Sequence, residues 1–136
     1  HIKEVWTNNN EIYYDYILSW FKSIFTKPQL KSKVALVLRS KDKQIGKGII
    51  ISDFLIPYIF GNKMSMSIAG LNPVVSRFNK IMMKKLLINC DELSSLTGDY
   101  HTTFDVLLKR ITDPTINIEF KGGKSFIYPD YSNYIM

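Results

Sequence analysis

Two short apolar runs, each bounded by charged residues, constrain the fold of this 136-residue chain more than any other feature. The runs are Val34–Leu38 (VALVL) and Leu86–Cys90 (LLINC). Continuous apolar runs of this length are typical of strands that are buried on both faces of a sheet. Longer segments with helical spacing of apolar residues surround them. This alternation predicts an α/β sheet with helices on both faces, in which ligands bind beyond the carboxyl ends of the strands.

The N-terminal part of the chain is predicted to be helical. Asn8 to Asn10 offer caps for a helix over about residues 11–25, which Pro28 ends. We interpret the aromatic stripe of this helix as core packing, because helical periodicity alone accounts for it. The stripe consists of Ile12, Tyr13, Tyr16, Ile17, Trp20 and Ile24. A second helix is expected in GKGIIISDFLIPYIFG (46–61), where Gly61 suits a C-cap.

The remaining sequence predicts further helices and strands in alternation. KMSMSIAG (63–70) is a candidate strand, and NPVVSRFNKIMMKK (72–85) a helix with Asn72 as its cap. HTTFDVLLKRITD (101–113) is helical, with Phe104, Leu107, Leu108 and Ile111 on one face. TINIEFKGGKSFIY (115–128) predicts a β-hairpin that turns at Gly122–Gly123, and SNYIM (132–136) begins another strand.

Composition indicates one globular domain without a membrane span. The chain is 46% hydrophobic and 22% charged, and its apolar runs fall short of the ~18 residues that a transmembrane helix needs. No secretory leader is visible, so we expect a protein that is not secreted. Cys90 is the single cysteine, which excludes an internal disulfide and cysteine-based metal binding. The net charge of +6 and the pI near 9.4 favour a polyanionic partner.

The segment SKDKQIGKG (40–48), directly after the first buried run, is a candidate phosphate-binding loop. Such a loop aims backbone N–H groups at phosphate oxygens and places a lysine against the β- and γ-phosphates. Gly46 and Lys47 fit the end of the GxxxxGK[ST] pattern, whereas Lys41 replaces its first glycine and Gly48 its Ser/Thr. The loop therefore lacks the hydroxyl that normally binds Mg²⁺.

Two acidic residues follow the second buried run. An ATPase needs a carboxylate at the end of a buried strand beside the loop strand to hold Mg²⁺, and a second group to orient the attacking water. Asp91 and Glu92 stand in that order after LLINC. The alternative is that Asp91 caps the segment that follows and binds no ligand.

These motifs together resemble the superfamily 3 helicase core of large DNA viruses, virophages and related mobile elements, including poxvirus-type primase-helicases. The matching segments are SKDKQIGKG, Phe60–Gly61, SRFNKIMMKKLLINCDE, LLKRITD, the basic hairpin IEFKGGKS, and an asparagine, Asn133, in YSNYIM. The resemblance covers the chain from about Trp20 to its end. The chain begins with His1, and we expect it to be a piece of a longer protein.

The resemblance implies an AAA+-like P-loop NTPase fold: a three-layer α/β sandwich with a mainly parallel sheet, an N-terminal helix and a hairpin before the last strand. Residues 1–30 would be a helical lead-in and 31–136 a partial ATPase core without its C-terminal part and arginine finger. The implied activity is that of an ATP-dependent DNA helicase in viral or mobile-element replication. It would work as a homo-oligomeric ring, usually a hexamer, on single-stranded DNA, in the cytoplasm, virus factory or nucleus of an infected cell.

By position, the resemblance also implies roles for individual residues. ATP would be bound by Gln44, Ile45, Gly46, Lys47, Gly48 and Ile49. Asp91 would bind Mg²⁺, Glu92 would polarise the water, and Asn133 would sense the γ-phosphate. In the hairpin, Lys121 and Lys124 would face DNA.

Two other interpretations stay open. The chain is alternatively a truncated P-loop domain that acts as a non-catalytic structural or nucleic-acid-binding module, or another P-loop NTPase such as an initiator or packaging ATPase. Lys80, Lys84 and Lys85 are interpreted as a solvated helix face. For the C-terminal aromatics core packing is expected rather than base stacking; these are Phe126, Tyr128, Tyr131 and Tyr134.

Overall fold

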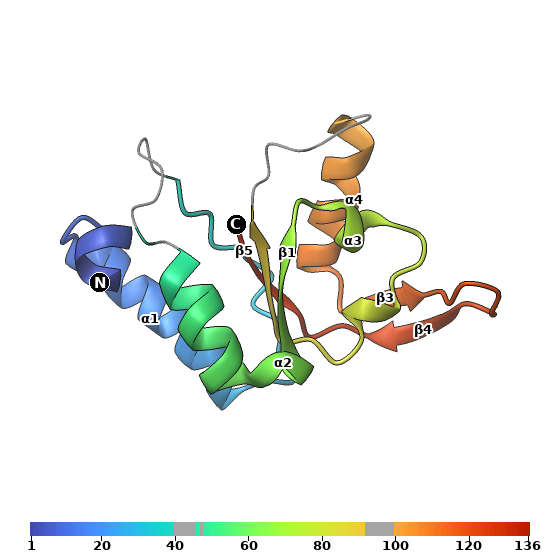
Figure 1. Ribbon diagram of the computed structural model, residues 1–136, viewed down its shortest axis with the longest axis horizontal. Coiled ribbons are helices and arrows are strands. Elements are labelled where there is room, and N and C mark those ends of the chain that lie inside the picture. Colours follow the sequence, from blue (N-terminus) through green and yellow to red (C-terminus); the bar gives the residue numbers. More distant parts are fainter. Residues whose placement is uncertain (40–45, 47, 92–99) are drawn as a thin grey trace.

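A computed structural model of the chain describes residues 1–39, 46, 48–91 and 100–136. Figure 1 shows a small central sheet with helices on both sides and a hairpin that projects from one end. The helical elements are η1 (Ile2–Trp6), α1 (Glu11–Thr26), η2 (Ile49–Phe60), α2 (Gly61–Met64), α3 (Asn72–Val75), η3 (Lys80–Met82) and α4 (Tyr100–Thr112). The strands are β1 (Ser65–Ala69), β2 (Leu87–Asp91), β3 (Thr115–Ile118), β4 (Phe126–Pro129) and β5 (Asn133–Ile135).

The central sheet is parallel throughout, as the sequence predicts. β2 lies between β1 and β5, and in the register Ser65 pairs with Leu87 and Leu87 with Asn133. Leu36 extends the sheet by a parallel bridge with Ile135. The prediction that Val34–Leu38 is a strand buried on both faces is wrong, because Val34 and Val37 are exposed at this edge and only Leu36 is buried. The spatial order is therefore β1, β2, β5 and then the Leu36 segment.

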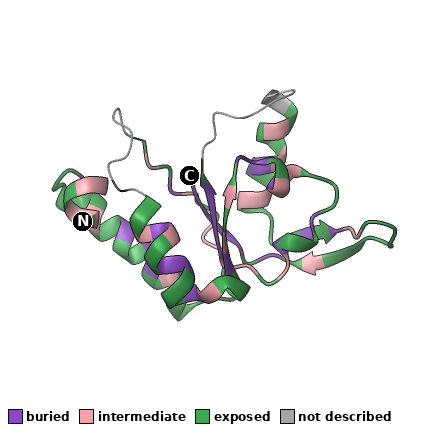
Figure 2. Cartoon of the chain, in the orientation of Figure 1, coloured by how far each residue is buried: buried purple, intermediate pink, exposed green. Residues whose placement is uncertain are grey.

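Alternate side chains of the central strands fill two separate cores. Leu87 and Ile135 pack with buried residues of α1 and η2 on one face. Ile88 and Tyr134 pack on the other face against residues of α3 and α4. Buried residues accordingly follow the strands and the sheet-facing sides of the helices (Figure 2). The prediction of an α/β sheet covered on both faces is confirmed.

The predicted hairpin is also confirmed. β3 and β4 pair antiparallel, with Thr115 opposite Pro129 and Ile118 opposite Phe126. Gly122 in the turn has a φ of 79°, a conformation that favours glycine because it lacks a Cβ. Ile116 and Ile118 are buried and join the core beneath α4.

Helix α1 matches the prediction closely in extent and less well in its buried face. Asn10 caps it, accepting a hydrogen bond from the backbone N–H of Tyr13 at 3.1 Å. Its buried residues are Ile17, Trp20, Phe21 and Ile24. The first turn is different, because Ile12 and Tyr13 are exposed. Tyr16 is exposed as well, so three of the six stripe residues are core and the interpretation as core packing holds only from Ile17 onward.

The predicted helix over 72–85 is wrong. α3 ends after one turn at Val75, and Ser76 is extended with a ψ of 154°. The short helix η3 follows only after residues that lie against β3. The reason is the side chain of Asn79, which is buried and bonds to the backbone of the hairpin rather than to its own helix.

Within the described residues, no helix combines the length and the apolar character that a bilayer crossing requires.

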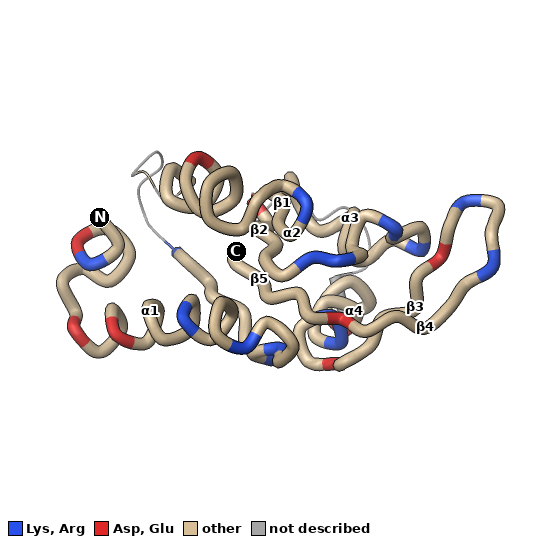
Figure 3. The backbone as a smooth tube through the Cα atoms, turned by 90° about the horizontal axis from the view of Figure 1, so that it is seen from below, with Lys and Arg blue, Asp and Glu red and all other residues tan. Residues whose placement is uncertain are grey.

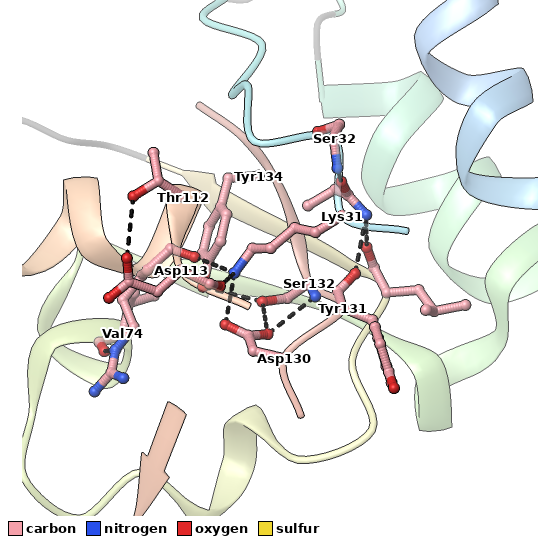
Figure 4. Close-up of polar contacts among 12 residues, drawn as sticks. Lys31, Ser32, Val74, Thr112, Asp113, Asp130, Tyr131, Ser132 and Tyr134 are labelled. Atoms are coloured by element: carbon pink, nitrogen blue, oxygen red, sulfur yellow. Dashed lines mark hydrogen bonds and ion pairs between the residues drawn. The ribbon is translucent and has the colours of Figure 1, made fainter. Parts of the chain in front are cut away.

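A buried ion pair joins three distant parts of the chain. Lys31 Nζ lies 2.7 Å from Asp130 Oδ2, and both side chains are less than 5% exposed. Lys31 also donates to the carbonyl oxygens of Arg110 and Asp113 at the end of α4 (Figure 4). Burial lowers the pKa of Lys31, an effect that Asp130 opposes. Asp130 in turn accepts from the backbone N–H and the hydroxyl of Ser132.

We expect Lys31→Met to lower the free energy of unfolding by about 3–5 kcal/mol, because it leaves the Asp130 carboxylate buried without a counter-charge. Urea unfolding followed by circular dichroism measures this. Lys22→Met, at an exposed position of α1, is the matched control and should change little. The double variant Lys31→Met/Asp130→Leu should recover part of the loss. Equal effects of Lys31→Met and Lys22→Met would contradict the assignment.

Candidate functional site

The carboxyl edge of the parallel sheet is the candidate site, and two strand ends meet there. Leu36, Ile135 and Asn89 lie level across the sheet. Two residues further along each strand, Leu38 and Asp91 reach the same edge. β5 lies between them, so their backbones are about 10 Å apart at normal strand spacing. The expectation that the acidic strand lies directly beside the loop strand is therefore wrong by one strand.

Asp91 is well placed to bind a ligand at this edge. It is the last residue of β2 and its side chain is exposed. Its backbone carbonyl accepts a hydrogen bond from the N–H of Gly70 at 2.7 Å, which fixes the end of the strand. Strand alternation puts Asp91 on the same face as Leu87, the face that η2 and α1 cover. Glu92 lies outside the described residues.

In the described part of the GKG segment, only Gly46 has a backbone conformation that requires glycine. Gly46 has a φ of 82°, and a Cβ there would lie 2.9 Å from the His1 ring. The His1 ring and the Gly46 carbonyl oxygen are in hydrogen-bond contact at 3.0 Å. Gly48 has ordinary helical angles and directly precedes Ile49, the exposed first residue of η2. Gln44, Ile45 and Lys47 lie outside the described residues.

Asn133 lies at the opposite end of the sheet. It pairs with Leu87 at the start of β2, whereas Asp91 is at the end of that strand. Its side chain is buried and fully engaged: Oδ1 accepts from Ser32 N–H at 2.9 Å, and Nδ2 donates to the carbonyls of Leu86 and Tyr131. These contacts fasten the segment before Leu36 to β5. The structure thus does not bring Asn133 together with Gly46 and Asp91.

Two buried titratable side chains of β2 and β5 have raised pKa values. Burial raises the pKa of the Cys90 thiol to about 12. Burial and the nearby Asp130 carboxylate likewise raise the pKa of Tyr134. Both residues belong to the core beneath α4, which agrees with the interpretation of Cys90 as a buried apolar residue.

The hairpin carries the two lysines predicted to face DNA. Lys121 and Lys124 are exposed in its turn, far from the candidate edge. Figure 3 shows Lys and Arg positions gathering along the hairpin and the neighbouring loop. At the base of the turn, the rings of Phe120 and Phe126 stack with centroids 5.7 Å apart. The two lysines and the carboxyl edge are therefore separate places on the molecule.

The sequence reasoning missed the contribution of residues 77–80, which it assigned to a helix. Arg77 forms an ion pair with Glu119 of the hairpin at 2.8 Å. Lys80 is exposed, as predicted, but it begins the one-turn helix η3 instead of lying on a long helix, and its ammonium sits 5.3 Å from the centre of the Phe120 ring. Lys85 donates to three backbone carbonyls near the start of β1, and burial lowers its pKa. The FN pair in SRFNK was the available signal, since asparagine favours irregular backbone.

The fold defines the chain as an α/β protein with a parallel central sheet, in which Leu38 and Asp91 lie at the same carboxyl edge. The profile of a family of unknown function, DUF5906, matches residues 38–136. The chain belongs to this family. No curated protein matches the chain.

Solved structures of the NrS-1 C terminal region share the fold. The apo structure of residues 305–718 superposes with a TM-score of 0.81 at 22% identity, over 98% of this chain and 31% of that one. An A form apo structure of the same region gives a TM-score of 0.75 at 18% identity, with the same coverage. This chain thus spans about a third of the NrS-1 region that it matches.

We expect Asn133→Ala to lower the free energy of unfolding by about 1–3 kcal/mol, because it leaves the Ser32 N–H without its partner in a buried setting. Chemical unfolding measures the loss. Asn62→Ala, at an exposed position of α2, is the matched control. A fully stable Asn133→Ala variant would contradict this structural role.

Proposed function

We propose that this protein is a P-loop ATPase, the motor part of a DNA helicase that serves viral or mobile-element replication. The observation that carries the proposal is the shared edge of the sheet. Two strands end level with each other at the carboxyl edge of the sheet: the one that leads to SKDKQIGKG and the one that leads to Asp91–Glu92. Asp91 lies on the face of the sheet that η2 covers. ATP bound there would have the loop on one side and the acidic pair on the other.

Each residue has a distinct task in this proposal. Gly46, whose φ of 82° favours glycine, would let the backbone N–H groups approach the phosphates, and the start of η2 would add the positive end of a helix. Lys47 would contact the β- and γ-phosphates. Asp91 would hold Mg²⁺, which supplies charge neutralisation at the β/γ oxygens. Glu92 would take up hydrogen bonds from the attacking water and so orient it.

The DNA-binding part of the proposal rests on the hairpin. Lys121 and Lys124 are exposed beside stacked aromatic rings, the combination by which proteins hold single strands. We include a ring of identical subunits in the proposal, because the resemblance to superfamily 3 helicases implies one. An arginine supplied by a neighbouring subunit would then complete each site, a contribution that can reach ~10³–10⁵ in rate.

One observation favours the second candidate, a non-catalytic module with the same fold. Gly48 occupies the position of the hydroxyl that coordinates Mg²⁺ in the common loop. Asp91 would then be the only protein ligand that the described residues offer from the motif. Nucleotide binding and hydrolysis separate the two candidates.

We expect Mg²⁺-dependent binding of ATP that Lys47→Ala abolishes, because the lysine supplies the charge opposite the β- and γ-phosphates. Isothermal titration of the protein and the variant measures it. Lys33→Ala, which removes a lysine before the same strand, is the matched control and should bind as the parent does. If the folded parent shows no heat of binding, the ATPase proposal fails and the non-catalytic module takes its place.

Gly48→Thr should tighten Mg²⁺-dependent ATP binding, since it returns the missing hydroxyl. Gly48 has a φ of −68°, and an added Cβ meets nothing within 4 Å, so the backbone and the space both accept a side chain. Gly48→Val adds similar bulk without the hydroxyl and should not tighten binding. The gain should disappear when EDTA removes the metal. Equal affinities of the Thr and Val variants would contradict the metal role of this position.

A further inference from the structure

Residues 77–80, called here the Arg77–Lys80 segment, lie beside the hairpin and are held there by hydrogen bonds. In Figure 1 the loop that contains this segment runs between α3 and η3 and lies beside β3. Asn79 attaches it: Nδ2 donates to the Asn117 carbonyl at 2.8 Å, and Oδ1 accepts from the Glu119 N–H at 3.0 Å. The amide thus satisfies the edge of β3 that faces away from β4. Asn79 is 1% exposed, so it orients its neighbours outward.

The neighbours of Asn79 are cationic and aromatic. Arg77 forms its ion pair with Glu119, and its guanidinium lies 5.8 Å from the centre of the Phe78 ring. Phe78 is 50% exposed. On the other side of Asn79, Lys80 lies over the Phe120 ring. Phe78 belongs to neither core cluster, and half of its surface is open to solvent beside the two cations.

The charge of this end of the molecule is strongly one-sided. Residues 76–85 and 115–129 hold six Lys and Arg residues and a single acid, Glu119, which Arg77 neutralises. Basic residues interleaved with exposed rings match a flexible polyanion that carries flat, stackable groups. Duplex DNA keeps its bases stacked inside and offers no face for Phe78. The chemistry therefore fits a single strand.

We propose that the Arg77–Lys80 segment and the Phe120–Phe126 pair form one binding surface for single-stranded DNA, in which Phe78 stacks on a base and Asn79 is a positioning residue. This inference rests on the proposed DNA-binding function of the hairpin and extends the binding surface from the turn lysines to the Arg77–Lys80 segment. The turn lysines contact phosphates, whereas Phe78 holds a base. The two contributions differ in their response to salt, which makes them separable.

The test measures binding of a fluorescein-labelled oligo-dT to the full-length protein at several salt concentrations. Phe78→Ala should weaken binding roughly ten-fold with an unchanged salt slope, because stacking releases no counterions. Phe78→Trp should retain or strengthen binding. The double variant Lys121→Ala/Lys124→Ala should instead flatten the slope by about 0.7 for each phosphate that it no longer neutralises. Tyr58→Ala, an aromatic 77% exposed on η2, is the matched control and should bind as the parent does.

The outcomes distinguish the inference from the function on which it rests. If the lysine variant loses affinity and Phe78→Ala binds as the parent does, the proposed role of the Arg77–Lys80 segment is wrong and the DNA-binding function of the hairpin is retained. Lost affinity in Phe78→Ala that Phe78→Trp restores supports the inference. Weakening by Phe78→Ala together with a flatter salt slope overturns the stacking role. Absence of oligo-dT binding by the folded parent overturns both.

Discussion

The buried ion pair between Lys31 and Asp130 is the constraint on which the arrangement of the other elements depends. A buried charge is tolerated only when its partner and hydrogen bonds replace water, and here the replacements come from far apart in the sequence. Lys31 leads into the Leu36 segment, its carbonyl partners end α4, and Asp130 stands between the hairpin and β5. One ammonium group therefore sets where three connections cross.

The apolar cores then follow from the alternation of β2 and β5. Leu87 and Ile135 face α1 and η2, while Ile88 and Tyr134 face α3 and α4. A slip of one residue would exchange the two sets, so the register is strongly specified. Asn133 reinforces it at the amino end, because its three hydrogen bonds are possible only when Ser32, Leu86 and Tyr131 are in place. At the carboxyl end the same register brings Leu38 and Asp91 level.

The features that could be predicted from the sequence are those that local chemistry determines. The buried run of β2, the cap at Asn10 and the glycine turn at Gly122 each depend on residues within a few positions, and all three were predicted correctly. The run Val34–Leu38 was not, because its position at the edge of the sheet, which leaves Val34 and Val37 exposed, is set by a distant partner, Ile135. The long helix over 72–85 failed because Asn79 bonds to Asn117 and Glu119, about forty residues away. The position of β5 between two earlier strands likewise depends on a return of the chain that periodicity does not encode. For the same reason Asn133 matched the motif of a γ-phosphate-sensing asparagine, yet it lies at the opposite end of the sheet from Asp91.

The hairpin and the candidate nucleotide edge are separate on the surface, but the segments that lead to them are joined through the buried Lys31–Asp130 pair. The end of α4, the end of β4 and the segment before Leu36 all meet at Lys31, whose long side chain is held by charge and hydrogen bonds on every side. Separating Lys31 from Asp130 would leave a carboxylate unpaired in a buried setting, which is costly. Lys31 is five residues before Leu36, whose strand leads to the GKG loop. The buried pair therefore joins the base of the hairpin and the end of α4 to the segment that leads into the proposed phosphate-binding loop, and the geometry of this junction is fixed by charge and hydrogen bonds.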